Sequence, residues 1–140
     1  MLFRSGDPQA IPPLLQALKD EDSYVRKAVC EALGAISDPQ AIPPLLQALK
    51  DEAWWVRDAA CWALGAISDP QAIPPLLQAL KDEDWEVRKA ACWALGAISD
   101  PQAIPPLLQA LKDKDSYVRE AACEALWRIS VRHKAPIRAS

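Results

Sequence analysis

The chain has 140 residues, of which 51% are hydrophobic and 25% are charged, and its formal net charge at pH 7 is −3. This acidic balance argues against a protein that binds nucleic acid or an anionic membrane surface, since neither a phosphate backbone nor acidic lipid is attracted to negative charge. The sequence shows no apolar run long enough to span a bilayer and no signal peptide, so we expect a cytoplasmic protein without membrane contacts.

A unit of 31 residues occurs four times in register, at residues 7–37, 38–68, 69–99 and 100–130. Each copy opens with the same fourteen residues, DPQAIPPLLQALKD, and 22 of the 31 columns never change. A fixed period of this length is typical of a solenoid, in which each unit buries its apolar face against its neighbours. The sequence therefore predicts one elongated domain over residues 1–140, with residues 131–140 forming a C-terminal helix extension and tail.

Two amphipathic helices are expected in each repeat. In the first repeat, apolar residues recur at helical spacing over residues 11–18 and again over residues 25–36. Pro12 and Pro13 are tolerated only in the first turn of a helix, so the first helix must be short. The Asp-Pro pair that opens each repeat predicts a 3₁₀-like turn before this helix.

The second helix of each repeat is expected to begin after an N-cap residue. In the first repeat this residue is Asp22, because aspartate accepts hydrogen bonds from the free backbone N–H groups of a first turn. The helix should end near Gly34 or Ile36. Ala53 takes the cap position in the second repeat, where we expect some loss of local stability.

The two ends of the array differ from its centre. Trp127 and Arg128 replace a Gly-Ala pair, which we interpret as the loss of a helix stop, so the last helix should run on toward Lys134. Trp127 is expected to cover the last layer of the core. The first helix, Asp7–Leu18, is identical to the internal ones, so its outer face should be apolar and uncapped. Such a face favours a homodimer or end-to-end stacking.

An aspartate and an arginine hold invariant positions in every repeat. We interpret them as a structural ladder of hydrogen bonds between turns and helices of neighbouring repeats, because half-buried guanidinium and carboxylate groups need partners that a stack can supply. This interpretation explains their invariance better than a catalytic role does. The ladder residues are Asp20, Arg26, Asp51, Arg57, Asp82, Arg88, Asp113 and Arg119.

Each repeat also carries one cysteine. Equivalent positions on stacked helices lie roughly 8 to 10 Å apart, whereas a disulfide needs Cα atoms within about 7 Å. We therefore expect four reduced, semi-buried packing residues, in keeping with a cytosolic compartment. They are Cys30, Cys61, Cys92 and Cys123.

The unit AIPPLLQALKDEDxxVRxAACxALGAIS resembles the HEAT-like repeats of the phycobilisome-lyase type, and it is similar to the artificial alphaRep scaffolds. The shared features are a leucine-rich first helix, an Asp-x-x-Val-Arg turn and a second helix of small residues ending in Ala-Leu-Gly. The resemblance covers residues 7–130 and implies an all-α, right-handed α-solenoid of four helix-turn-helix repeats, with the second helices on the concave face. It leaves function open, since such repeats serve lyases, glycosylases, hydroxylases and adaptors.

All six tryptophans lie in the nine columns that vary between repeats. Residues 54, 58 and 62 are four apart and share one helix stripe, and residues 85, 89 and 93 should lie beside them. Trp and Tyr ringed by charges are typical of a protein-binding hot spot, so we predict a non-enzymatic scaffold that binds another protein through its concave face. The candidate residues are Tyr24, Lys27, Glu31, Trp54, Trp55, Asp58, Trp62, Trp85, Glu86, Lys89, Trp93, Tyr117 and Glu120.

A packing interpretation competes with the binding one. Neighbouring tryptophans can simply pack on one another between repeats, with Asp58 and Lys89 forming a weak surface ion pair. In either interpretation Trp55 flanks the two tryptophan rows and is expected to face Glu86 of the following repeat.

Enzymes with HEAT-like repeats offer further alternatives. Alkylpurine glycosylases use Trp and Asp in a concave cleft, but the basic track that would hold DNA is missing here. Deoxyhypusine hydroxylases need several His-Glu pairs for a di-iron site, whereas His133 is the only histidine of this chain. We therefore expect no metal site, no cofactor and no catalytic histidine pair.

Bilin chemistry is the main functional alternative, because the resemblance implies a bilin lyase, isomerase or accessory protein. Cys61 or Cys92 would then offer a thiol near the tryptophans. Against this, Cys30 and Cys123 are identical in the outer repeats, which lack the central tryptophans, as packing residues would be. A self-assembling repeat fragment and a designed scaffold with no native ligand also stay open.

Overall fold

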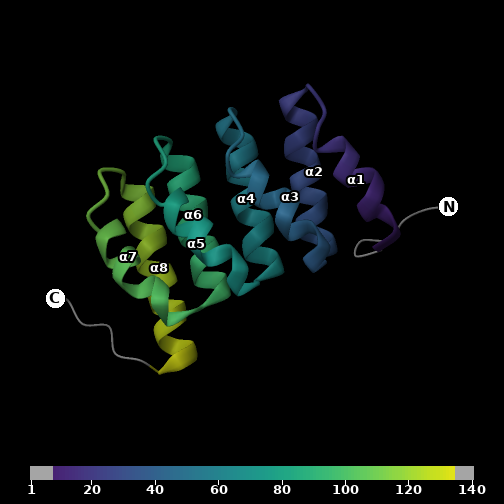
Figure 1. Cartoon of the computed structure of the whole chain (residues 1–140). Coiled ribbons are helices and arrows are strands. Elements are labelled where there is room, and N and C mark those ends of the chain that lie inside the picture. The colour runs from purple at the N-terminus through teal and green to yellow at the C-terminus, as the bar shows by residue number, and fades with distance from the viewer. Residues whose placement is uncertain (1–7, 135–140) are drawn as a thin grey trace.

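The computed structural model describes residues 8–134, which form helices and turns only (Figure 1). The predicted tail over residues 135–140 lies outside this range. Within it, no helix is long and apolar enough to cross a bilayer. The elements are η1 (Pro8–Ala10), α1 (Ile11–Ala17), α2 (Ser23–Ile36), η2 (Pro39–Ala41), α3 (Ile42–Ala48), α4 (Trp54–Ile67), η3 (Pro70–Ala72), α5 (Ile73–Ala79), α6 (Trp85–Ile98), η4 (Pro101–Ala103), α7 (Ile104–Ala110) and α8 (Ser116–His133).

The first helix of every repeat is short, as the prolines predict. Helix α1 has 7 residues and carries Pro12 and Pro13 in its first turn, where the missing N–H group costs no hydrogen bond. The expected 3₁₀ turn precedes each first helix. From the second repeat on, its N-cap is an aspartate such as Asp38, whose carboxylate accepts a hydrogen bond from the backbone N–H of Gln40 at 2.8 Å. The four repeats thus form the predicted α-solenoid.

The caps of the second helices are not equivalent. Asp22 and Asp115 each accept a hydrogen bond from the backbone N–H two residues later, at 2.8 Å. Ala53 makes no such bond, because its methyl side chain cannot accept a hydrogen bond. Asp84 also leaves its own helix uncapped, because its carboxylate accepts from the guanidinium of Arg57 at 2.8 Å instead. Two of the second helices therefore begin without a side-chain cap.

The first three second helices end at isoleucine, so the predicted end at Ile36 is confirmed, whereas the interpretation of the glycine as a helix stop was wrong. Helix α2 continues to Ile36, and Ser37 follows in the left-handed conformation with a φ of 60°. The next residue precedes a proline, which disfavours a helical backbone there. No such proline follows Ser130, and α8 runs to His133 before Lys134 turns left-handed. The predicted extension is confirmed, but its cause is the missing Asp-Pro pair.

Glycine instead brings neighbouring second helices into close contact. A Cβ atom on Gly34 would lie 2.8 Å from the Cα atom of Ala63, and one on Gly96 would lie 2.9 Å from the Cα atom of Ala125. The second helices consequently pack on one another far more extensively than the first helices do. The second helices thus form a closely packed layer, and the first helices form a more widely spaced one. This difference in spacing curves the array, with the second helices on its concave side.

Trp127 occupies this glycine position in the fourth repeat. Its side chain is 64% exposed, so the prediction that it covers the core was wrong. The reason is geometric. A Cβ atom on the equivalent Gly96 would point toward Ala125 of the following repeat and away from the core of its own repeat. An indole in this position stands on the outer face of the fourth repeat.

The invariant arginines join each repeat to the next. Arg26 binds Asp51 with two hydrogen bonds, from Nε at 2.8 Å and from Nη2 at 3.1 Å, and donates from Nη1 to the carbonyl oxygen of Asp20 at 2.8 Å. Arg57 with Asp82 and Arg88 with Asp113 repeat this geometry. The ladder thus ties a turn, its own second helix and the following turn together.

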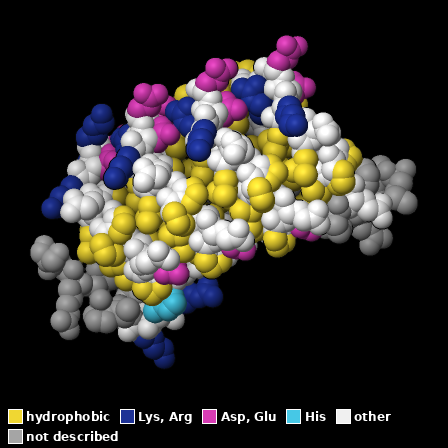
Figure 2. Space-filling view, in the orientation of Figure 1, with side chains coloured by type: hydrophobic (Ala, Val, Ile, Leu, Met, Phe, Trp, Pro, Cys, Tyr) yellow, Lys and Arg dark blue, Asp and Glu magenta, His cyan; other side chains and the backbone are white. Residues whose placement is uncertain are grey.

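Charged side chains gather along the edge of the array that holds these turns (Figure 2). The exposed lysines and glutamates of the turns stand beside the ladder, while the helices on the face shown carry mostly apolar and uncharged side chains. On this face, charge is therefore concentrated at the edge that holds the turns.

Substituting Gly65 by alanine tests the close helix contact. In an exposed helix this change stabilises by about 1 kcal/mol, but here the added methyl group would meet the Cα atom of Ala94 at 2.8 Å and the ring of Trp93 at 2.6 Å. We expect the free energy of unfolding to fall by about 1 to 3 kcal/mol, measured by denaturant titration. Ala66→Gly, at an exposed neighbouring position, measures the propensity effect alone. A Gly65→Ala variant more stable than the parent would contradict the tight contact.

The ladder predicts a loss of stability in acid. Burial alone raises the pKa of Asp51, but hydrogen bonds from Arg26 and from the backbone N–H of Ala53, with the guanidinium charge, hold that pKa below its ordinary value. A pKa that is lower in the folded state stabilises the fold above the unfolded value of about 3.9, and this stabilisation is lost as the pH falls through the folded pKa.

We therefore expect the free energy of unfolding to stay level down to about pH 5 and to decline below about pH 4. Asp51→Asn should be less stable at neutral pH and should show a shallower acid decline. Glu52→Gln removes an exposed carboxylate beside it and should keep the full decline. Denaturant unfolding at a series of pH values measures both, and equal acid slopes in the two variants would refute the assignment.

Candidate functional site

Seven aromatic side chains lie on the second helices, on the concave side of the array. We call them the aromatic surface. They occupy columns that vary between repeats, whereas the columns of the ladder stay constant and those of the core change little, as from Val29 to Ala60. The aromatic surface consists of Tyr24 on α2, Trp54, Trp55 and Trp62 on α4, Trp85 and Trp93 on α6, and Tyr117 on α8.

Trp55 is held by the repeat before it. Its ring stacks on Tyr24 with centroids 5.6 Å apart and meets Trp54 edge-on at the same separation. Its indole Nε1 donates a hydrogen bond to the Oγ atom of Ser23 at 3.0 Å. The ring thus packs against the preceding repeat, whereas the sequence placed it opposite Glu86.

Trp62 and Trp93 form the centre of the surface. Their ring centroids are 4.3 Å apart, and the indole Nε1 of Trp62 donates to the carboxylate of Asp58 at 3.1 Å. Trp93 is half-buried because its ring lies on the backbone of Gly65, where a Cβ atom would be 2.6 Å away. Trp62 packs on the solvent side of Trp93 and is 37% exposed.

Trp85 pairs with the following repeat. Its ring stacks on Tyr117 with centroids 5.4 Å apart, and the Nζ atom of Lys89 lies 5.7 Å from the centroid of Tyr117. The two predicted tryptophan rows therefore meet at one end only, since Trp62 touches Trp93 but Trp85 and Trp54 have other ring partners. None of the ion pairs within residues 8–134 joins Lys89 to Asp58. The ion pair that the packing interpretation proposed therefore does not form.

Charged side chains border the rings. Burial raises the pKa of Asp58, although the hydrogen bond from Trp62 and the charges of Lys27 and Lys89 act in the opposite direction. Glu31 and Glu120, on the outer helices, are exposed. The surface thus has half-buried charges between its rings and solvated charges at its rim.

A small cavity of about 160 Å³ opens beside the central pair of tryptophans, between α6 and α8. Sequence reasoning missed four of its lining residues. Glu124 stands in the same variable column as Glu31 and Trp62, which was a sufficient signal, whereas Arg128 varies only in the last repeat and Ala121 and Ala125 are invariant. The lining residues are Trp62, Lys89, Trp93, Ala121, Glu124, Ala125 and Arg128.

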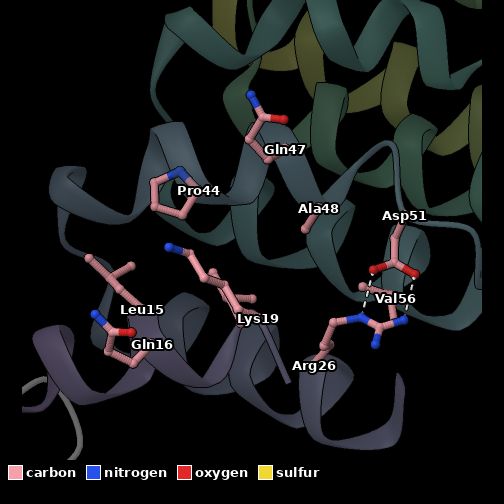
Figure 3. Close-up of a pocket in the computed structure, with 10 residues that line it drawn as sticks. Leu15, Gln16, Lys19, Arg26, Pro44, Gln47, Ala48, Asp51 and Val56 are labelled. Atoms are coloured by element: carbon pink, nitrogen blue, oxygen red, sulfur yellow. Dashed lines mark hydrogen bonds and ion pairs between the residues drawn. The ribbon is translucent and has the colours of Figure 1, made fainter. Parts of the chain in front are cut away.

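Larger pockets lie between the first helices. The one between α1 and α3 has a volume of about 400 Å³, and Figure 3 shows Leu15 and Lys19 facing Pro44, with the Arg26–Asp51 pair at one end. Equivalent pockets of about 420 and 470 Å³ follow along the array. Only invariant columns line them, so the comparison of repeats contained no signal for them. Their walls are mostly apolar, and each pocket is also lined by one lysine, which is Lys19 in the first pocket, and by one aspartate of the ladder.

Three of the four cysteines are fully buried, so the expectation of semi-buried thiols was wrong. Burial raises the pKa of Cys30 and of Cys92 to about 12 and raises that of Cys61 as well. Cys123 is exposed. The thiols near the central tryptophans are therefore protonated and covered, which disfavours them as nucleophiles. In the described part of the chain, no group of three or more His, Cys, Asp or Glu side chains is placed to hold a metal ion.

The family model described as HEAT repeats matches residues 1–59 and 42–127. No curated protein sequence matches the chain significantly. Among solved structures, a chain from the complex of CpcE and CpcF of phycocyanin lyase from Nostoc is 28% identical, with a TM-score of 0.78 over 88% of this chain and 53% of that one. Human deoxyhypusine hydroxylase is 29% identical, with a TM-score of 0.76 over 94% of this chain and 48% of the hydroxylase.

A designed armadillo repeat protein in complex with the peptide (KR)4 is also similar, at 25% identity and a TM-score of 0.69 over 86% of this chain and 64% of that one. The chain thus spans about half the length of the two natural proteins and about two thirds of the designed one.

Thiol labelling tests the burial of the cysteines. With a chromogenic disulfide reagent at pH 8, we expect Cys123 to react at once and the other three thiols to react slower by on the order of 100-fold, because they are covered and their pKa values are raised. Denaturant should release all four. Cys123→Ser should abolish the fast phase, and a fast phase that persists in this variant would place a reactive thiol near the tryptophans.

Proposed function

The chain belongs to the HEAT-repeat family, and we propose that it is a non-enzymatic scaffold that binds another protein through its aromatic surface. The supporting observation is the exposure of rings that repeat packing does not need. Tyr24 and Tyr117 are 69% and 57% exposed, and Trp62 and Trp85 are each 37% exposed. The outer repeats carry serine in the column of Trp54 and Trp85 and glutamate in the column of Trp62 and Trp93, so the fold itself does not require these four rings.

The contacts between rings support binding as well as packing. Tyr24 is stacked on Trp55, Trp62 lies on Trp93, and Trp85 is stacked with Tyr117. Rings that are already held in place lose little conformational freedom when a partner covers them, which favours affinity. Exposed charges surround the rings, in the arrangement of a hot spot with a polar rim.

The similar structures also support a partner that is a protein or a peptide. The phycocyanin lyase chain is in a complex of CpcE with CpcF, and the designed armadillo repeat protein is in complex with a peptide. We extend this mode of binding to the present chain, with the aromatic surface as the contact.

A bilin lyase-like accessory protein is the second candidate, and the likeness to the phycocyanin lyase complex favours it. The covered thiols of Cys61 and Cys92 oppose covalent bilin attachment at the aromatic surface. Titration with a free bilin, followed by tryptophan fluorescence quenching, separates the candidates. Saturable quenching that is lost in the Trp62→Ala variant would favour the bilin candidate over the protein scaffold.

Alanine substitution of Trp62 and Trp85 together tests the proposed function. Peptides selected on the parent protein from a random display library should bind this double variant at least about tenfold more weakly, because exposed tryptophans dominate the energy of such interfaces. Trp127→Ala is the matched control, since it removes a tryptophan that is 64% exposed but lies outside the aromatic surface. It should keep the affinity within about twofold. Calorimetry or fluorescence anisotropy measures the binding.

Stability measurements separate binding from packing. The double variant should keep its helical circular dichroism and most of its melting temperature, because both rings are partly solvent-exposed. If it unfolds, the more exposed Tyr24→Ala and Tyr117→Ala take its place. A large loss of stability with unchanged peptide affinity would favour the packing interpretation, and peptides that depend on Trp127 instead would exclude the aromatic surface.

A further inference from the structure

The outer faces of the first and fourth repeats are the two halves of the contact that joins repeats inside the molecule. Val25 on the first repeat is 36% exposed, whereas its equivalents Val56 and Val87, which have a repeat before them, are 0% and 1% exposed. Cys123 on the fourth repeat is exposed, whereas Cys92, which has a repeat after it, is fully buried. Because the repeats are nearly identical in sequence, each of these faces has the shape that fits the other, except where Trp127 stands in place of glycine.

The charges of the two faces are complementary as well. Within residues 8–134, the carboxylate of Asp20 has no guanidinium partner and the guanidinium of Arg119 has no carboxylate partner, and both residues are exposed. Between neighbouring repeats the same pair closes at 2.8 to 2.9 Å. A second copy of this chain, docked head to tail, would bring its own Asp20 to Arg119.

One residue prevents this docking. The contact between repeats needs glycine, because a Cβ atom on Gly96 would lie only 2.9 Å from the Cα atom of Ala125. Trp127 holds the glycine position on the outer face of the fourth repeat, and the residue it would meet on a second copy is Ala32. Even its Cβ atom would be too close to that backbone, and the indole adds a larger obstruction.

We infer that these two faces are complementary surfaces for a second copy of this chain, and that Trp127 keeps them apart by taking the place of glycine. The contact is heterologous and does not close on itself, so an unobstructed pair of faces would add copies into open filaments. A bulky residue in the contact suppresses such growth, as blocked edges do in sheets. This inference concerns different residues from the aromatic surface and does not rest on the proposed function.

The substitution Trp127→Gly should open the contact. We expect its mass, measured by sedimentation velocity and light scattering, to rise with concentration, and its association to be at least about tenfold stronger than that of Trp127→Ala. Alanine is the matched control, because it removes the indole but keeps the Cβ atom that glycine lacks. The parent chain should show no association through these faces. Equal association of the alanine and glycine variants, a monomeric glycine variant, or a parent that assembles as strongly would each overturn the inference.

A charge swap in the Trp127→Gly background tests the orientation. Arg119→Asp and Asp20→Arg should each weaken self-association at least about tenfold, because each leaves like charges facing one another. Mixing the two variants restores opposite charges at every junction and should restore the rising mass. Both positions are exposed, so the fold should persist, which thermal unfolding checks. A mixture that stays as weak as its separate components would refute head-to-tail docking.

Discussion

The close approach of glycine to alanine between successive second helices is the constraint on which the other features depend. With Gly34 against Ala63, and its equivalents along the chain, no side chain separates these helices and their backbones nearly touch. The first helices meet no such requirement, so apolar pockets remain between them. Curvature, the narrow concave layer and the spread outer layer all follow from this one difference in spacing.

The same constraint explains where sequence variation is tolerated. Side chains between the helices must stay small, and the Arg–Asp ladder fixes the turns at the edge, so the side chains free to change point outward from the second helices. There the tryptophans of neighbouring repeats come close enough to touch, as Trp62 and Trp93 do at 4.3 Å. The narrow layer thus gathers rings from separate repeats into one surface.

Much of the candidate site was predictable, because residues four apart on a helix share a stripe and repeats in register place stripes side by side. Its internal contacts were not. Trp55 stacks on Tyr24 of the preceding repeat, and Lys89 lies over Tyr117 instead of pairing with Asp58. These choices depend on side-chain rotamers and on the distance between helices, which the pattern of one repeat does not contain.

The sequence by itself determined the α-solenoid, the short first helices and the aspartate cap of α2, because periodicity, proline geometry and capping act within one repeat. Only the tertiary structure decided what the glycines do, which cysteines are covered and where Trp127 points. Each of these depends on the neighbouring repeat: Cys92 has one after it and is buried, whereas Cys123 follows the same Ala-Ala pair but lies on an outer face and is exposed. Burial and close approach are properties of two packed repeats, so the sequence of a single repeat does not predict them.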